Sequence, residues 1–188
     1  SESPKTMVFD RALYIGAAAR IGVMQSDATP RMTFTMGLPA AGKSTVAKAM
    51  FARAAFIDCD AVKESHPDYD PSNPAALHAW SKAIVKEQFN AALEAGAGHF
   101  VYDTTGTNPE RMKAEMAAAR AAGFLVELVF ITVPLTVSIE RNLTRSRVVP
   151  LPILMEKAAM IEETFAAIKD HADALTVKDN STYDPAYA

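Results

Sequence analysis

The sequence has little cysteine, no long hydrophobic run and no excess of basic charge. Cys59 is the single cysteine, which excludes an internal disulfide and a zinc site built from cysteines. The histidines, at positions 66, 78, 99 and 171, lack the close spacing of metal ligands. Because the formal net charge is -3, nucleic-acid binding would require a local cluster of arginines.

The apolar segments also argue against membrane insertion and export. The longest run, FLVELVFITVPL, contains Glu127 and is well short of the ~20 residues that span a bilayer. The N-terminal stretch SESPKTMVFDRALYIGAAARIG has an acid and arginines where a secretory signal has an apolar core. Hydrophobic residues make up 49% and charged residues 22%, an ordinary balance for one globular domain. We therefore expect a soluble cytoplasmic protein with no membrane contact.

Apolar periodicity predicts strands that alternate with helices. The spacing of Phe9, Leu13, Ala17 and Ile21 predicts an amphipathic helix over residues 8–24, so residues 1–30 form an N-terminal helical extension and residues 31–188 the main domain. Strands are predicted over 31–36, 55–58, 99–103, 124–133 and 174–179, and helices over 42–54, 74–95, 108–123, 135–145 and 152–170. This order predicts an α/β fold, a three-layer αβα sandwich whose mainly parallel sheet binds ligands at its carboxyl edge.

The first motif with a clear chemistry is GLPAAGKS, which matches G-x-x-x-x-G-K-S between a predicted strand and a predicted helix. In such a loop, backbone N–H groups face phosphates, the lysine reaches the β- and γ-phosphates, and the serine hydroxyl binds Mg²⁺. Thr45 either joins this site or is simply a first-turn helix residue. The motif predicts a P-loop NTPase-type site for ATP and Mg²⁺ formed by Gly37, Pro39, Ala40, Ala41, Gly42, Lys43, Ser44 and Thr45.

A P-loop indicates that a nucleotide binds, but it does not identify the acceptor of the phosphate. The chain has no N-K-x-D string to read guanine, and it is short for a motor or helicase ATPase. Acids at the ends of the second and third strands are typical of a small kinase, in which a carboxylate accepts the proton of an attacking hydroxyl.

The second strand leads into FIDCDAVKESHPDYD, which supplies the candidate base. Period-two alternation places Asp58 and Asp60 on one side of an extended segment, toward the γ-phosphate. We assign Asp60 as the catalytic base; the alternative is that Asp60 caps a helix that begins at AVKES. Lys63 either binds the acceptor or is a solvated helix residue.

The third strand repeats this arrangement in VYDTTGTNPER. Asp103 ends an apolar run and is predicted to bind Mg²⁺ or the acceptor, and Thr105 to bind the acceptor hydroxyl. The alternative is a strand-to-helix turn in which Thr107 or Asn108 caps the next helix. Glu87, on the edge of the apolar stripe of helix 74–95, is a further acceptor contact or a solvated edge residue.

The segment ERNLTRSRVVP supplies a cluster of arginines. Arg141 and Arg145 are four residues apart and share one face of the predicted helix, and Arg147 follows. A helical lid of this kind can close over ATP and stabilise the phosphoryl group in transfer, so Arg145 is assigned to ATP and the other two to catalysis. The alternative is a solvated basic face.

These motifs, in this order, resemble the zeta-toxin and polynucleotide-kinase-like P-loop kinases from about Met32 to Lys178. HPDYD resembles zeta toxins, which phosphorylate UDP-N-acetylglucosamine. DTTGTNPER and RN…R…VP resemble the phage-type polynucleotide 5′-hydroxyl kinases. The chain has Asp103 where zeta toxins favour a glutamate, and Lys63 where polynucleotide kinases carry an arginine.

The resemblance implies a role for each matching position. It implies that Lys43 and Ser44 serve ATP and Mg²⁺ and that Asp60 is the base. It also implies acceptor contacts at Glu87, Asp103 and Thr105, and phosphate contacts from Arg141 and Arg147.

Three functions remain open from the sequence. The first is an ATP- and Mg²⁺-dependent kinase for a nucleotide sugar, and the second is a polynucleotide 5′-hydroxyl kinase, for which nucleic acid is the substrate. The third is a non-catalytic ATP-binding module that regulates a protein partner. For a toxin-like kinase, residues 8–24 would dock over the nucleotide cleft or contact an antitoxin or other inhibitory protein; otherwise they complete the core.

Overall fold

The structure is a computed structural model that describes residues 29–182. The helix predicted over residues 8–24 lies outside the described residues. Within the described range, no helix is both long and apolar enough to cross a membrane.

A parallel sheet forms the centre of the domain. Its strands are β1 (Arg31–Met36), β2 (Ala55–Ile57), β3 (His99–Asp103), β4 (Leu125–Thr132) and β5 (Ala174–Asp179), in the order β2-β3-β1-β4-β5. Each neighbouring pair is parallel, so the carboxyl ends meet at one edge. The strand order reverses at β1, and ligands of such sheets bind in the crevice at that point. The predicted strands and the α/β fold are confirmed.

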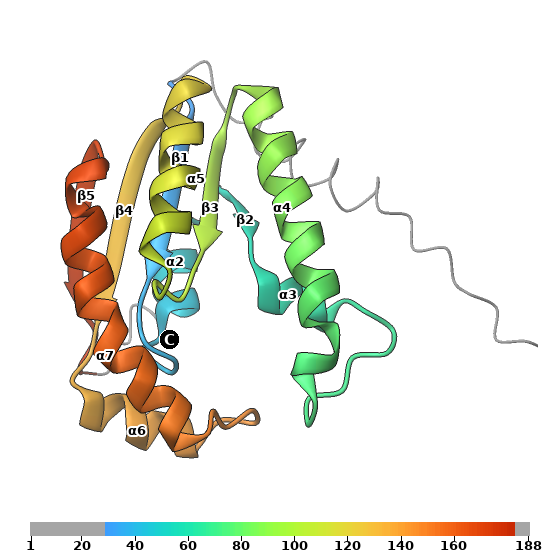
Figure 1. The fold of residues 1–188 in the computed structure, drawn as a ribbon, viewed down its shortest axis with the longest axis vertical. Coiled ribbons are helices and arrows are strands. Elements are labelled where there is room, and N and C mark those ends of the chain that lie inside the picture. The colour runs from blue at the N-terminus through green and yellow to red at the C-terminus, as the bar shows by residue number, and fades with distance from the viewer. Residues whose placement is uncertain (1–28, 183–188) are drawn as a thin grey trace, which may run out of the picture.

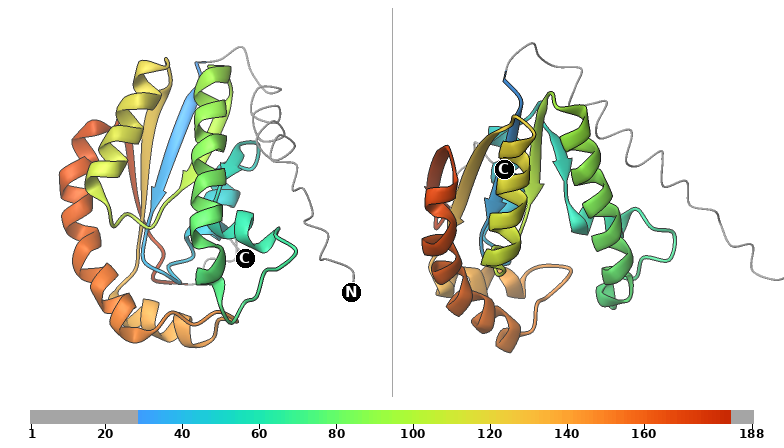
Figure 2. Two further views of the ribbon diagram at one scale, coloured as in Figure 1. Left: turned by 45° about the vertical axis from the view of Figure 1, so that its right-hand side comes forward. Right: turned by 45° about the horizontal axis from the view of Figure 1, so that its top comes forward.

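Helices cover both faces of this sheet (Figure 1), which gives the predicted three-layer αβα sandwich. Helices α4, α5 and α7 lie on one face and α2 lies on the other. Helix α6 lies beyond the carboxyl edge, and the chain between α6 and α7 extends toward the end of α4 (Figure 2). The helices are α2 (Lys43–Met50), α3 (Cys59–Glu64), α4 (His78–Ala95), α5 (Pro109–Ala121), α6 (Leu135–Leu143) and α7 (Leu151–Ile168), with 3₁₀ turns η1 (Pro74–Leu77) and η2 (Lys169–His171).

Strand β1 shows why the sheet is buried on both faces. Met32, Phe34 and Met36 have no exposed surface, and the Phe34 ring packs against Phe89 of α4. Burying one such side chain contributes about 1.5–3 kcal/mol. The alternate residues are buried threonines with hydrogen-bond partners, and Thr35 donates to Asp103 at 2.5 Å. The strand therefore anchors the core on one face and positions a site carboxylate on the other.

Several predicted helix bounds are wrong by a few residues. The helix predicted over 42–54 ends at Met50, and the one over 74–95 begins as the 3₁₀ turn η1. The helix predicted over 135–145 ends at Leu143, so Arg141 and Arg145 do not share a helical face. The reason is local: the amide of Asn142 bonds both N–H and C=O of Val149 and closes a tight loop directly after α6.

Candidate active site

The P-loop joins β1 to α2 and leaves the first turn of α2 open to a ligand. Gly42 has φ +80, in the left-handed region that favours glycine, and no side chain caps the helix. The first N–H groups of α2 therefore lack side-chain partners, and an anion can bind there. Ala40 also has positive φ, at 61, a conformation that costs energy for a residue with a side chain.

Side chains from α6 and from the end of β5 form hydrogen bonds with backbone carbonyls of the P-loop. Ser138 donates to the Pro39 carbonyl at 2.7 Å, and the amide of Asn180 donates to the Ala41 carbonyl at 2.7 Å. Because a peptide is planar and trans, fixing the Ala41 carbonyl also fixes the following N–H on the opposite side. These contacts orient the loop before any nucleotide binds.

Arg141 belongs to the same support. Its guanidinium donates to the Asn180 carbonyl at 2.7 Å and to the Ala41 carbonyl at 3.5 Å, and it lines neither of the two cavities described below. The expected contact of Arg141 with the phosphoryl group stays a prediction. Gly37 likewise lines neither cavity, and it lies against the Ile131 carbonyl, where a side chain would not fit.

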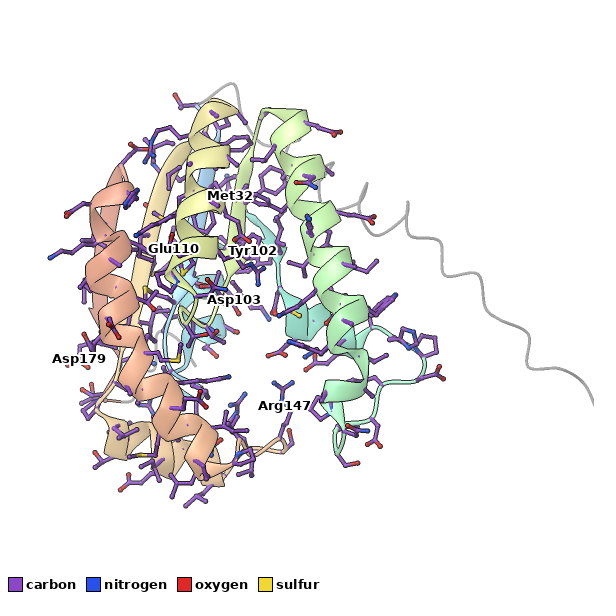
Figure 3. The ribbon with its side chains drawn as sticks, in the orientation of Figure 1. Met32, Tyr102, Asp103, Glu110, Arg147 and Asp179 are labelled. Carbon is purple, nitrogen blue, oxygen red and sulfur yellow. The ribbon has the colours of Figure 1, made fainter. Side chains whose placement is uncertain are left out.

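Two cavities open at the carboxyl edge of the sheet. The smaller, about 260 Å³, is lined by the P-loop from Leu38 to Thr45 and by Arg145. The larger, about 500 Å³, is bounded by α3, α4, α5 and the loop after β3, and its volume is typical of a small-molecule site. The residues that line both cavities are Lys43, Asp60, Asp103, Thr105, Arg147 and Lys157. Figure 3 shows Asp103 at the end of β3 and Arg147 on the loop after α6.

Asp60 lies at the junction of these cavities, but not on an extended segment as predicted. Asp58 is the N-cap of α3 and accepts the N–H of Asp60 at 2.8 Å, so the chain becomes helical after Asp58 and Asp60 sits in the first turn. Arg147 forms an ion pair with Asp60 at 3.1 Å. Burial raises the pKa of Asp60, but the charges of Arg147, Lys63 and Lys43 outweigh burial and bring the pKa below its ordinary value. The carboxylate is therefore ionised and can accept a proton.

Asp103 and Asp58 supply the negative charge beside the P-loop. Asp103 lies 3.4 Å from the ammonium of Lys43, and Thr35 donates to the same carboxylate. Burial, followed by the charge of Asp103, raises the pKa of Asp58. The two carboxylates therefore repel one another, and a cation near them would relieve that repulsion.

These groups fit Mg²⁺ held together with nucleotide phosphates. Residues 29–182 contain no group of three or more His, Cys, Asp or Glu side chains that could bind a metal by themselves. Mg²⁺ normally takes one or two carboxylates, water and phosphate oxygens, so a full protein cage is not needed. The ligands available are the exposed Ser44 hydroxyl and the carboxylates of Asp58 and Asp103.

Lys157 of α7 is a site residue that the sequence analysis missed. Burial, and then the charge of Lys43, lower its pKa, because several cations converge at the junction. Leu154 and Ile161 of the same helix are buried, and Lys157 lies between them at the three- and four-residue spacing of one helix face. A lysine on the buried face of an apolar helix was the signal that could have identified it.

The acceptor residues predicted from the sequence are only partly brought together. Thr105 lies at the junction, and Lys63 lines the larger cavity with 6% of its surface exposed, so the solvated alternative for Lys63 is wrong. Glu87 is half-buried on α4 and lines neither cavity. Asn108 caps α5 through the N–H of Arg111, as its alternative predicted.

A linked trio on the far wall of the larger cavity was also missed. Arg111 pairs with Glu115 at 2.7 Å and donates to the hydroxyl of Tyr102 at 2.5 Å. Burial and the charge of Glu115 raise the pKa of Tyr102 to about 12, so its hydroxyl stays protonated. Arg111 and Glu115 are four residues apart on α5, a spacing visible in the sequence, whereas Tyr102 comes from β3 and only folding brings it to them.

Comparison with known proteins agrees with this fold. Residues 32–174 match the family described as AAA domain. The chain belongs to the AAA domain family. No curated protein matches it.

Several solved structures are also similar to this AAA domain. It is similar to a structure of the PezAT chromosomal toxin-antitoxin system of Streptococcus pneumoniae, with 15% identity over 95% of this chain and 76% of that chain, and a TM-score of 0.72. It is also similar to AvrRxo1-ORF1:-ORF2 with ATP, with 16% identity over 85% and 56% of the two chains and a TM-score of 0.68. A sugar kinase from Janibacter sp. HTCC2649 matches with 18% identity over 80% and 86%, and a TM-score of 0.50. At these identities the likeness shows the fold, and the resemblance to zeta-toxin-like P-loop kinases is confirmed at that level.

Proposed function

We propose that this AAA domain is an ATP- and Mg²⁺-dependent kinase that transfers the γ-phosphate to a hydroxyl of a nucleotide-type acceptor. UDP-N-acetylglucosamine or a related nucleotide sugar is the acceptor in this proposal. The P-loop cavity takes ATP, and the larger cavity takes the acceptor.

One observation carries the proposal: an ionised carboxylate, Asp60, lies where a P-loop cavity and a second cavity meet. A P-loop that only binds nucleotide needs no general base at that position. A kinase needs one within reach of both the γ-phosphate and the acceptor hydroxyl.

The residues at the junction divide the chemistry among them. Asp60 takes the proton of the acceptor hydroxyl as the new O–P bond forms and the bond between the γ-phosphorus and the β,γ-bridging oxygen breaks, releasing ADP. The cationic groups of Lys43, Arg147 and Lys157 stabilise the negative charge on the phosphoryl oxygens in transfer. Ser44, Asp58 or Asp103 would hold Mg²⁺, which would supply positive charge to offset the charge of the ATP phosphates.

The acceptor and the protein partner are proposed from the resemblances. HPDYD resembles zeta toxins, and one similar structure comes from a toxin-antitoxin system and another from a two-component complex with ATP. We include a restraining protein partner in the proposal for that reason. A polynucleotide 5′-hydroxyl end is the second acceptor, because the larger cavity is lined by Lys63, Lys82 and Arg111.

The deciding experiment is transfer from γ-labelled ATP with Mg²⁺ to UDP-N-acetylglucosamine and, in parallel, to a 5′-hydroxyl oligonucleotide. Asp60→Asn should retain ATP binding and lose roughly 10²-fold or more in kcat, because the general base is gone. Glu64→Gln is the matched control, since Glu64 is an exposed acid of the same helix and lines neither cavity.

Each result has a distinct meaning. Label on the sugar nucleotide, lost in Asp60→Asn and kept in Glu64→Gln, supports the proposal. Label on the oligonucleotide replaces the acceptor with a nucleic-acid end. ATP binding without transfer to any tested alcohol, or full activity in Asp60→Asn, contradicts the proposed mechanism.

A further inference from the structure

The larger cavity has a cationic wall that the P-loop nucleotide does not use. Lys63 of α3 and His78 and Lys82 of α4 line the larger cavity, and none of the three lines the smaller one. Helices α3 and α4 pack against each other, which brings the three side chains to one wall. Their ligand must therefore be whatever occupies the acceptor cavity.

Lys63 is a buried cation that forms no ion pair within residues 29–182; its charge acts on the carboxylate of Asp60, which is itself paired with Arg147. The residue is 6% exposed, and its ammonium is 3.3 Å from Nδ1 of His78. Because an ammonium only donates, Nδ1 of His78 accepts, so this partner carries no negative charge. No carboxylate of residues 29–182 forms an ion pair with Lys63. A buried charge in this state is costly unless a ligand compensates it.

The carboxylates that line the cavity form no ion pair with this wall within residues 29–182: Asp58 accepts the N–H of Asp60, and the others pair elsewhere. Asp60 is paired with Arg147, and Asp103 with Lys43, while Arg111 on the opposite wall is paired with Glu115. Lys82 is exposed and forms no ion pair within the described part of the chain. Burial and the charges of Lys63 and Lys82 lower the pKa of His78, which keeps its ring neutral and able to accept the lysine proton. The two lysines on this wall are therefore available to bind an anionic group of a ligand.

We propose that Lys63, with His78 and Lys82, forms a subsite for the phosphate or diphosphate group of a small-molecule acceptor. This inference rests on the proposed kinase function and deepens it, because it requires an anionic acceptor such as a nucleotide diphosphate sugar and rejects a neutral alcohol. The volume of about 500 Å³ suits such a molecule. With the anionic group on this wall, the hydroxyl to be phosphorylated lies toward Asp60 at the junction.

The test is calorimetric binding to the full chain with ADP and Mg²⁺ present, so that the P-loop is filled before the acceptor is added. UDP-N-acetylglucosamine should bind the wild-type protein, and Lys63→Met should weaken it roughly 10-fold or more, the usual effect of losing a hydrogen bond to a charged group. ADP affinity should not change. N-acetylglucosamine, which lacks the diphosphate, should bind weakly and equally to both proteins.

Two further variants separate recognition from folding. Lys86→Met is the matched control, because Lys86 is an exposed lysine one turn along α4 from Lys82 and lines neither cavity. Lys63→Arg keeps the positive charge and should recover part of the affinity. Replacing an unpaired buried ammonium by a methionine of similar length should not lower the melting temperature, whereas a structural role for Lys63 would lower it.

Unchanged affinity for UDP-N-acetylglucosamine in Lys63→Met would overturn the subsite, as would an equal loss of ADP binding. If the wild-type protein does not bind this sugar nucleotide, the proposed acceptor fails, and inorganic pyrophosphate added to the ADP-filled protein then decides the subsite. Pyrophosphate binding that Lys63→Met weakens supports it; binding that is absent or insensitive overturns it. If Lys63→Met weakens the binding of a 5′-hydroxyl oligonucleotide and of no small molecule, the proposal of a small-molecule acceptor is overturned.

Discussion

At the scale of single residues, the pair formed by Asp60 and Arg147 links the base to the phosphate-binding cations. The two residues are 87 positions apart and their side chains are 3.1 Å apart. The positive charge offsets the effect of burial on the carboxylate and lowers its pKa. Together with Lys63 and Lys43, Arg147 on the loop after α6 therefore favours the ionised form of the proposed base.

The pH dependence of activity tests this pair. Arg147→Gln removes a positive charge that lowers the pKa of Asp60, while burial still raises it. The pKa of Asp60 should therefore rise, and the acidic limb of the kcat/KM profile should move to higher pH. The wild-type profile should be flat down to about pH 5, because the proton-accepting form persists there. Arg145→Gln is the control, since Arg145 lines the smaller cavity but does not pair with Asp60. An acidic limb that does not move in Arg147→Gln contradicts the electrostatic coupling.

At the scale of elements, α6 and the end of β5 act as a support for the P-loop. Ser138 and Arg141 are three residues apart on one face of α6 and bond to the loop, and Asn180 reaches the same loop from β5. A Cβ at Gly42 would collide with the Asn180 amide, so this close approach also requires the glycine. Helix α6, the first part of the predicted lid, thus holds the P-loop in place.

Removing one of these contacts should affect ATP binding more than turnover. Ser138→Ala loses a hydrogen bond to the Pro39 carbonyl, and we expect the KM for ATP to rise roughly 2- to 10-fold with a smaller change in kcat. Ser138→Thr retains the hydroxyl and should restore ATP binding. Thr136→Ala, at an exposed position of α6, should behave as wild type. A fall in kcat with unchanged KM would show that Ser138 does not position the loop.

At the scale of the whole molecule, a second polar cluster lies at the amino edge of the sheet, away from the active site. Thr33 contacts His99 at 2.8 Å and donates to Glu127 at 3.1 Å, and Glu127 pairs with Arg31. Burial, and then the charge of Arg31, lower the pKa of His99 to about 4. This cluster joins β1, β3 and β4 and stabilises the sheet in its neutral-histidine form.

That histidine should make folding stability depend on pH. Between the ordinary histidine pKa of 6.5 and the folded value of about 4, the unfolded chain binds a proton that the folded chain does not. Lowering the pH through this window therefore lowers the free energy of unfolding. Urea unfolding at about pH 7 and about pH 5 should show a smaller difference for His99→Gln than for wild type. His171→Gln, at an exposed position, should match wild type; a difference of equal size in all three proteins would exclude His99 as the source.

The fold could be predicted closely from the sequence because each element depends on neighbours in the chain. Apolar runs, together with the proline and glycine residues at helix ends, indicated every described strand and nearly every described helix, with errors of a few residues at the ends. The α3 helix was indicated only by the alternative in which Asp60 caps a helix at AVKES; the helix instead begins at Cys59 because Asp58 accepts the N–H of Asp60, which an alternation pattern does not reveal.

By itself, the sequence determined the P-loop, the alternating strands and helices, and the acids that follow β2 and β3, because spacing along the chain is enough to specify them. The tertiary structure alone decided which charges meet. It paired Asp60 with Arg147, brought Lys157 to the junction of the two cavities, and placed Arg141 beside Asn180 at the P-loop. It also buried Lys63, which forms no ion pair within residues 29–182. Such contacts join segments up to 139 residues apart, and they depend on the strand order β2-β3-β1-β4-β5, which no local pattern encodes.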